Sequence, residues 1–576
     1  MSKKALLVLA LPLSITAAFA RTQQIPKAEL DLKIINSNQS NYVLKNAKGT
    51  LLSTSFLSVR PENWFNLSPA DGAEGVRTEE TYKAFGMPAS EDIVVAVIDS
   101  GVDVNHDDLQ GKIWINEGEI PNDGIDNDGN GYVDDVFGWN FIGGAHGMVS
   151  IVEDASLKNG IRLVKGASEA QVDADTLEIT RELVRMKKLK ARVEELGESL
   201  TEAQASYLAS LDKEVTAAVE NAKQVVTTYS ARLKQYKAAE AVLRTAGVSI
   251  MSIEAVRSLE SSDPSVIEAK KTMIQLLSSN NTEARLNRIL DSYSDQIQYY
   301  YNESFNPRTI VGDNYANQNE KVYGNNDVIG PDSSHGTHVA GIIAAVRDNN
   351  LGVKGVATNV KIMAIRVVPN GDERDKDVAN GIRYAVDNGA KVINMSFGKA
   401  YSPFKKVVDE AVKYAESKGV LLVHAAGNSN QNNDTERNFP NRRLISGGES
   451  NNWLEIGASA FEKGLGLPAT FSNYGKKSVD IFAPGVDILS TVPDNKYDTY
   501  SGTSMASPAA AGVATLLLSY EPSMDAKAVR SLMIETSRRY PGLKVNLPGT
   551  QEKVRFSDLS IYGSIADVFE ATKYLK

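Results

Sequence analysis

Continuous apolar runs that end at small or polar residues most constrain the fold of this chain. The first run, Ile93–Ile98, is apolar throughout and rich in β-branched residues. Such a run is typical of a buried strand in a parallel sheet. Helical patterns over 375–388 and 404–418 alternate with the runs. This alternation predicts an α/β fold: a doubly wound, mainly parallel sheet with helices on both faces. The runs cover residues 93–98, 361–368, 391–395 and 419–425.

The segment 155–304 has a different character and predicts a large all-helical insertion. Between residues 171 and 300 it holds two of the chain's 43 glycines and one of its 19 prolines. Thr201 and Gln204 have the spacing of a capping box, and Asp263-Pro264 is typical of a helix start. We expect a long antiparallel hairpin of helices plus shorter helices. An apolar stripe at helical spacing supports this; its members are Met186, Leu189, Val193, Leu196 and Leu200.

The first twenty residues predict a cleaved signal peptide. Lys3 and Lys4 precede an apolar run, and Ala18-Phe19-Ala20 fits a cleavage site. The run is shorter than the ~20 residues that span a bilayer, so a membrane anchor is the weaker interpretation. We therefore expect an exported protein, periplasmic or extracellular, with no membrane span in the mature chain.

The amino-acid composition excludes disulfide bonds and disfavours two classes of binding partner. The chain has no cysteine, so no disulfide can stabilise it after export. Its net charge of −10 and pI near 5.3 argue against nucleic acid or anionic membranes as partners.

An acidic loop over 126–135 has the spacing of a calcium-binding loop. Gly131 stands at the sixth position, where such loops turn sharply. Position 12 is Phe137 instead of a glutamate, so the loop is not a complete EF-hand. A solvated turn is the alternative; we favour structural calcium, because carboxylates this dense repel one another without a cation. The expected ligands, at positions 1, 3, 5, 7 and 9, are Asp126, Asp128, Asn130, the carbonyl of Tyr132, and Asp134.

Three motifs carry an acid, a base and a nucleophile. They are Val-Ile-Asp99-Ser-Gly, His335-Gly-Thr-His-Val-Ala-Gly and Gly-Thr-Ser504-Met-Ala-Ser-Pro. Asp, His, Ser is one of the chain orders in which such triads occur. With these motifs the chain resembles the subtilases, the subtilisin-like serine proteases.

The resemblance implies a role for each motif residue. Asp99 would orient His335, the general base, and Ser504 would attack the peptide carbonyl. Asn428, in Ala-Ala-Gly-Asn-Ser, would complete the oxyanion hole. Structural alternatives exist: Asp99 or Ser504 as a helix cap, and Asn428 in a left-handed turn. The resemblance also implies an edge that pairs with an extended polypeptide substrate; its residues are Ser396, Phe397, Gly398 and Gly427.

The expected organisation places the insertion inside the catalytic domain. The parts are a signal peptide (1–20), an N-terminal arm or short pro-segment (21–60), the catalytic domain (61–154 and 305–576) and the insertion (155–304). The insertion's ends should lie close together at the surface.

The main functional hypothesis is a secreted serine endopeptidase. One alternative is a narrow-specificity processing protease whose insertion binds a protein partner or gates the site. A second, disfavoured because every motif position is filled, is a non-catalytic binding or scaffold protein. The insertion could also self-associate; packing between its own helices is the default.

Overall fold

The computed structural model describes residues 60–576 and three short strands that precede them. These strands form an antiparallel sheet in the order β1-β2-β3, within a unit that ends at Glu62. The expected signal peptide lies outside the described residues. The strands are β1 (Leu30–Ile34), β2 (Tyr42–Asn46) and β3 (Leu51–Ser53).

A nine-stranded sheet organises the second unit, residues 63–576. Its order is β15-β18-β12-β11-β10-β9-β4-β8-β5, and every pairing is parallel except that of β15 with β18. The predicted buried strands are confirmed. The strands are β4 (Ile93–Asp99), β5 (Gly138–Asn140), β8 (Val360–Arg366), β9 (Val392–Met395), β10 (Leu421–Ala425), β11 (Trp453–Ser459), β12 (Ile481–Pro484), β15 (Arg538–Arg539) and β18 (Ser564–Ile565).

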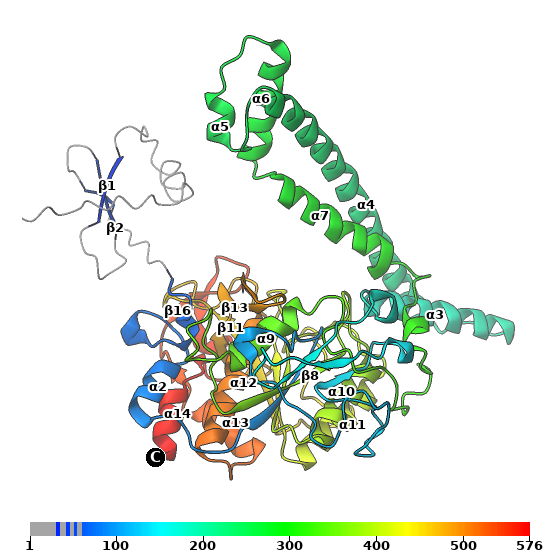
Figure 1. Cartoon of the computed structure of the whole chain (residues 1–576). Helices are drawn as coiled ribbons and strands as arrows, with labels where there is room; N and C mark the ends of the chain where they lie inside the picture. The colour runs from blue at the N-terminus through cyan, green and yellow to red at the C-terminus, as the bar shows by residue number, and fades with distance from the viewer. Residues whose placement is uncertain (1–29, 35–41, 47–50, 54–59) are drawn as a thin grey trace, which may run out of the picture. The chain divides into compact units, whose positions relative to one another are not determined.

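Both faces of this sheet are covered, which confirms the doubly wound α/β fold (Figure 1). Along β4 the side chains alternate: Val95 and Val97 join one core, Ala96 and Ile98 the other. Such alternation explains why a two-sided strand is apolar throughout. The first core includes α9 (Ser334–Ala344), α12 (Thr503–Tyr520), α13 (Ala526–Glu535) and α14 (Val568–Leu575); the second includes α10 (Asp375–Asp387) and α11 (Lys405–Ser417).

Shorter elements lie outside this sheet. Three antiparallel hairpins pair β6 with β7, β13 with β14 and β16 with β17. No helix among the described residues has the length and apolar character needed to cross a membrane. The elements are α2 (Thr78–Phe85), α8 (Arg308–Val311), β6 (Ile151–Glu153), β7 (Ile161–Leu163), β13 (Ile488–Val492), β14 (Lys496–Tyr500), β16 (Lys544–Asn546) and β17 (Lys553–Arg555).

The helical insertion begins later than expected. Strand β7 lies inside the range 155–304, so the all-helical interpretation is corrected at its start: after a 3-10 turn at Ser168–Ala170, the first α-helix of the insertion opens at Glu178. The capping box of Thr201 and the helix start at Pro264 are confirmed. Figure 1 shows α4 and α7 running side by side. The helices are α3 (Glu178–Glu195), α4 (Glu202–Thr245), α5 (Ile253–Ser258), α6 (Pro264–Ser278), α7 (Glu283–Asp295) and a π-helical turn, η7 (Gln296–Tyr300).

The two ends of the helical segment meet. The N–H of Leu177 donates to the carbonyl of Tyr300 at 3.0 Å. The helical part of the insertion, from α3 to η7, therefore starts and ends at one place, which we call its root. Beside this root, the buried Lys399 ammonium lies 2.8 Å from Asp375 and 3.4 Å from Glu178 of α3. A buried ion network thus joins the insertion to the chain just after Gly398.

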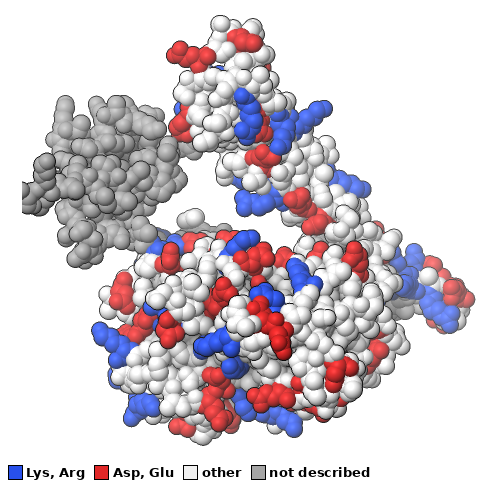
Figure 2. Space-filling view, in the orientation of Figure 1, with Lys and Arg blue, Asp and Glu red and all other residues white. Residues whose placement is uncertain are grey.

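Acidic and basic side chains are interspersed on the face of the molecule shown in Figure 2. Within the insertion they pair across helices: Lys187 of α3 lies 3.1 Å from Asp212 of α4. Exposed pairs of this kind contribute only about 0–1 kcal/mol each. The insertion's own apolar core, centred on Tyr236, Leu243, Met273 and Leu286, is the larger stabilising feature.

Candidate active site

Three adjacent strands and two helix N-termini converge at one edge of the sheet. Strands β4, β9 and β10 are neighbours and parallel, so their carboxyl ends share this edge. Helices α9 and α12, which pack against each other, begin with His335 and Ser504 in their first turns. Open α/β sheets place functional groups at this edge. All four residues expected to be catalytic end or follow these strands or lie in the first turns of these helices.

Asp99 and His335 are directly hydrogen-bonded. Asp99 ends β4 and is 1 % exposed, and its Oδ1 lies 2.7 Å from Nδ1 of His335. The same oxygen accepts the N–H of Ser100 at 2.7 Å. Burial lowers the pKa of His335, but the charge of Asp99 and its hydrogen bond outweigh burial and raise that pKa overall. Asp99 therefore favours the protonated ring, whose Nε2 is the nitrogen Asp99 leaves free.

Ser504 lies in the first turn of α12, as the sequence predicted. Its Oγ donates to the backbone oxygen of Ser396 at 3.0 Å, and Oγ of Ser396 donates to the backbone oxygen of Ser504 at 2.9 Å. The nucleophile candidate is thus tied to the segment after β9. A helix N-terminus also offers unsatisfied N–H groups beside the hydroxyl.

Asn428 and the backbone of Ser504 face a shared space beside Gly502. The side-chain oxygen of Asn428 accepts the N–H of Thr503 at 2.8 Å and its hydroxyl at 2.9 Å, which orients the amide. A Cβ added to Gly502 would lie 3.5 Å from both Nδ2 of Asn428 and N of Ser504. Both distances are ordinary contacts, so the amide of Asn428 and the N–H of Ser504 border the same space. This arrangement can stabilise a developing oxyanion.

The expected substrate edge, Ser396–Gly398, directly follows β9. A Cβ on Gly398 would lie 2.8 Å from Oδ1 of Asn438. Gly427 has φ +104°, and a Cβ there would lie 2.5 Å from Nδ2 of Asn473. A side chain at either glycine would therefore require Asn438 or Asn473 to move, and at Gly427 it would also strain the backbone. Asn438, which the sequence did not single out, separates them: its Nδ2 donates to the carbonyl of Ala426 at 2.9 Å.

The second histidine of the motif, His338, has a structural environment. Its Nε2 lies 3.0 Å from the carbonyl of Ile488 and 3.1 Å from that of Asp498, and its ring stacks on Tyr500 with centroids 4.4 Å apart. Burial, with a smaller contribution from His335, lowers the pKa of His338 to about 4. His338 is therefore neutral near pH 7 and packs behind the site.

Two of the expected calcium ligands in the acidic loop also accept backbone hydrogen bonds. Asp126 accepts the backbone N–H groups of Gly129 and Gly131, both at 2.8 Å. Asp134 accepts those of Asn122 at 2.6 Å and Gly124 at 3.2 Å. These two carboxylates hold the turns of the loop.

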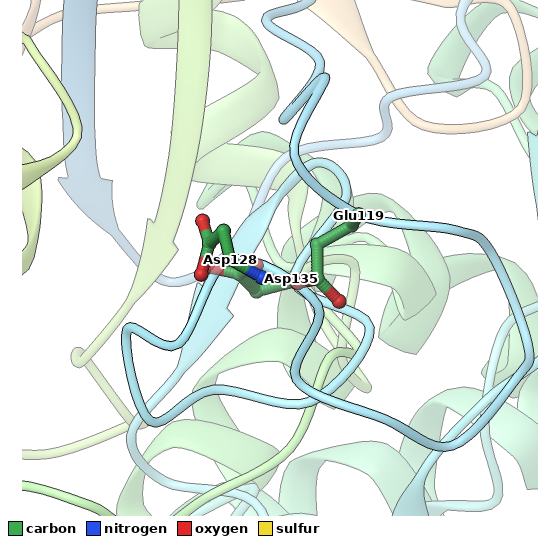
Figure 3. A group of neighbouring side chains, drawn as sticks. All are labelled: Glu119, Asp128 and Asp135. Carbon is green, nitrogen blue, oxygen red and sulfur yellow. Dashed lines mark hydrogen bonds between the residues drawn. The ribbon is translucent and has the colours of Figure 1, made fainter.

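A carboxylate cluster forms from Asp128 and two residues that the calcium-loop spacing did not indicate, Glu119 and Asp135. Candidate ligand oxygens of the three lie within 4.8 Å of one another, and Figure 3 draws the three side chains. Burial raises the pKa of Asp135 to about 6, and the charge of Asp128 adds to this. Among described residues, no Lys or Arg forms an ion pair with the three. Oxygen ligands of this kind suit Ca²⁺.

Comparison with known proteins agrees with this geometry. A model of the subtilase family matches residues 90–558. Thermitase of Thermoactinomyces vulgaris is 38% identical over 245 residues, 41% of this chain and 80% of thermitase. A thermophilic serine proteinase of Bacillus sp. (strain AK1) is 43% identical over 188 residues, 32% of this chain and 43% of that protein. Subtilisin E of Bacillus subtilis (strain 168) is 37% identical over 218 residues, 36% of this chain and 52% of subtilisin E. The matches thus span about half the length of two of these relatives and most of thermitase.

Proposed function

Because this chain belongs to the subtilase family of serine endopeptidases, we propose that it hydrolyses peptide bonds with Ser504, His335 and Asp99 as its triad. The observation that carries the proposal is the 2.7 Å hydrogen bond between buried Asp99 and His335 at the sheet edge where α12 presents Ser504. The substrates would be unfolded or loop segments of polypeptides.

In the proposed mechanism, Ser504 attacks the scissile carbonyl while Nε2 of His335 takes the hydroxyl proton. His335 then returns this proton to the leaving amine. Asp99 holds the ring by Nδ1 and stabilises the imidazolium without accepting the proton. The N–H of Ser504 and Nδ2 of Asn428 donate to the tetrahedral oxyanion.

Substrate binding is assigned to the segment Ser396–Gly398 and to Gly427. Backbone groups of an edge segment pair with an extended peptide whatever its side chains are, and glycine lets the substrate approach closely. This supports endopeptidase action on many sequences. We also propose that residues 1–20 direct export, which places the mature enzyme in the periplasm or outside the cell.

Covalent labelling tests the proposal. We expect a fluorophosphonate probe to label the wild-type protein, mass spectrometry to map the label to Ser504, and casein to be cut at many sites. Labelling without casein cleavage would favour the narrow processing protease instead. A folded protein that shows no label and no cleavage would contradict the proposal.

For the acidic loop we propose structural calcium, held by Glu119, Asp128 and Asp135. The three carboxylates, of which Glu119 and Asp135 are buried, lack cationic partners among described residues, and Asp135 has a raised pKa that a bound cation would reverse. The cation would supply the stabilisation that a chain without cysteine cannot obtain from disulfides.

Calcium should raise the melting temperature. A ligand at about 100 times its Kd stabilises the folded state by about 2.7 kcal/mol. Calorimetry of the protein with calcium and with a chelator measures the increment. We expect Asp128→Asn to abolish the calcium-dependent increase in melting temperature. Asp126→Asn should lower the melting temperature but keep the calcium-dependent increase. If both variants lose the increase, the ligands predicted from the loop spacing are supported. If calcium does not raise the melting temperature of the wild-type protein, the calcium site is excluded.

A further inference from the structure

A buried histidine and glutamate lie directly behind the substrate edge. His424 of β10 is 0% exposed and Glu455 of β11 is 4% exposed. The two residues are register partners on adjacent parallel strands. Nδ1 of His424 lies 3.1 Å from each carboxylate oxygen of Glu455, and Nε1 of Trp453 donates to the same carboxylate at 2.7 Å. The proposed catalytic steps use neither His424 nor Glu455.

The other ring nitrogen reaches the edge itself. Nε2 of His424 lies 2.8 Å from the backbone oxygen of Phe397. A carbonyl oxygen only accepts, so Nε2 carries a hydrogen. Two acceptors cannot bond to each other, so the 3.1 Å contact of Nδ1 with the carboxylate of Glu455 requires a second hydrogen on one of the two groups. The burial of both groups is thereby compensated.

This contact fixes the orientation of one peptide unit in the edge. The backbone oxygen of Phe397 is thereby held toward the ring of His424 on β10, and the residue before it in the segment is Ser396. Ser396 is also the residue that exchanges hydrogen bonds with Ser504. The segment is therefore anchored beside the candidate nucleophile.

We propose that His424 and Glu455 are positioning residues that hold the substrate-binding segment by the backbone oxygen of Phe397. This inference rests on the proposed function. His424 donates the hydrogen bond, and Glu455 orients the ring and sets its tautomer. The pair resembles Asp99 and His335 in pairing a carboxylate with Nδ1. The two pairs differ because Nε2 of His424 donates a hydrogen bond to a backbone carbonyl, whereas Nε2 of His335 is free to accept a proton.

Two isosteric variants separate the contacts of His424. The amide nitrogen of glutamine can occupy the place of Nε2, whereas that of asparagine can occupy only the place of Nδ1. His424→Asn leaves the Phe397 carbonyl buried without its donor. We expect this variant to lower kcat/KM for a chromogenic tetrapeptide by about 10- to 100-fold, mainly through KM. We expect His424→Gln to remain within about threefold of wild type.

The rate of labelling by a small alkyl fluorophosphonate provides the second measurement, because this probe needs Ser504 and the oxyanion hole but not the extended edge. We expect both His424 variants to label within about threefold of the wild-type rate. His106→Asn is the matched control. His106 is also fully buried and contacts a backbone oxygen, that of Lys496 at 3.1 Å. Its loss should change both rates by the same factor.

The inference is overturned if His424→Asn keeps tetrapeptide hydrolysis, or loses labelling and hydrolysis in parallel. It is also overturned if His424→Gln labels normally yet fails to hydrolyse the tetrapeptide. Failure of the proposed function is distinguishable, because there the wild-type protein itself would neither label nor hydrolyse. In that case both proposals fail together.

Discussion

Ser504→Ala is expected to lower kcat for peptide hydrolysis by about 10⁶-fold, the magnitude established for removing the triad serine in this family. Without Oγ no acyl-enzyme can form, and His335 has no hydroxyl to deprotonate. The oxyanion donors remain, since the N–H of residue 504 and the amide of Asn428 do not depend on the serine hydroxyl. A residual rate of about 10³–10⁴ over the uncatalysed reaction should therefore persist.

Steady-state hydrolysis of a chromogenic peptide measures this loss, with KM expected to change little because Oγ contributes mainly to the transition state. Ser523→Ala, at an exposed serine just beyond α12, is the control and should leave kcat unchanged. A loss of under about tenfold in Ser504→Ala would place the nucleophile elsewhere.

Local patterns explain why most of the fold was predictable. The two-sided strand β4 is apolar because both its faces are buried, and the start of α4 follows from the capping box at Thr201. The hairpin of β6 and β7 was missed because its strands are three residues each, too short for periodicity to show. Sheet order was also beyond prediction, since β4 pairs with β8 across more than 250 residues.

The candidate site also has residues that the sequence could predict and residues that it could not. Asp99, His335 and Ser504 stand in motifs, so the sequence alone indicated them. Glu455 does not: its contact with His424 depends on the register between β10 and β11. Glu119 likewise reaches Asp128 only through the path of an irregular loop. A residue whose role depends on contact with a residue of another strand or loop cannot be identified from the sequence until that contact is known.

Asp99→Asn is expected to lower kcat by about 10⁴-fold and to shift the pH profile of what remains. Catalysis needs neutral His335, so activity falls as pH decreases through the pKa of this residue. Burial lowers that pKa, and Asp99 raises it above the ordinary value through its charge and hydrogen bond. Removing the charge leaves burial to dominate. The acid limb of kcat/KM should therefore move to lower pH in the variant while the plateau drops.

The lower rate and the shifted acid limb have separate causes, so each tests a different role of Asp99. The rate falls because an asparagine can donate to Nδ1 and favour the tautomer in which Nε2 carries the hydrogen, so His335 cannot accept the proton of Ser504. The limb moves because the imidazolium loses its counter-charge. A lower rate with an unmoved limb would mean that His335 is not the group that titrates. A limb that moves to higher pH would contradict the electrostatic role assigned to Asp99, because removing an anion cannot stabilise the cation beside it.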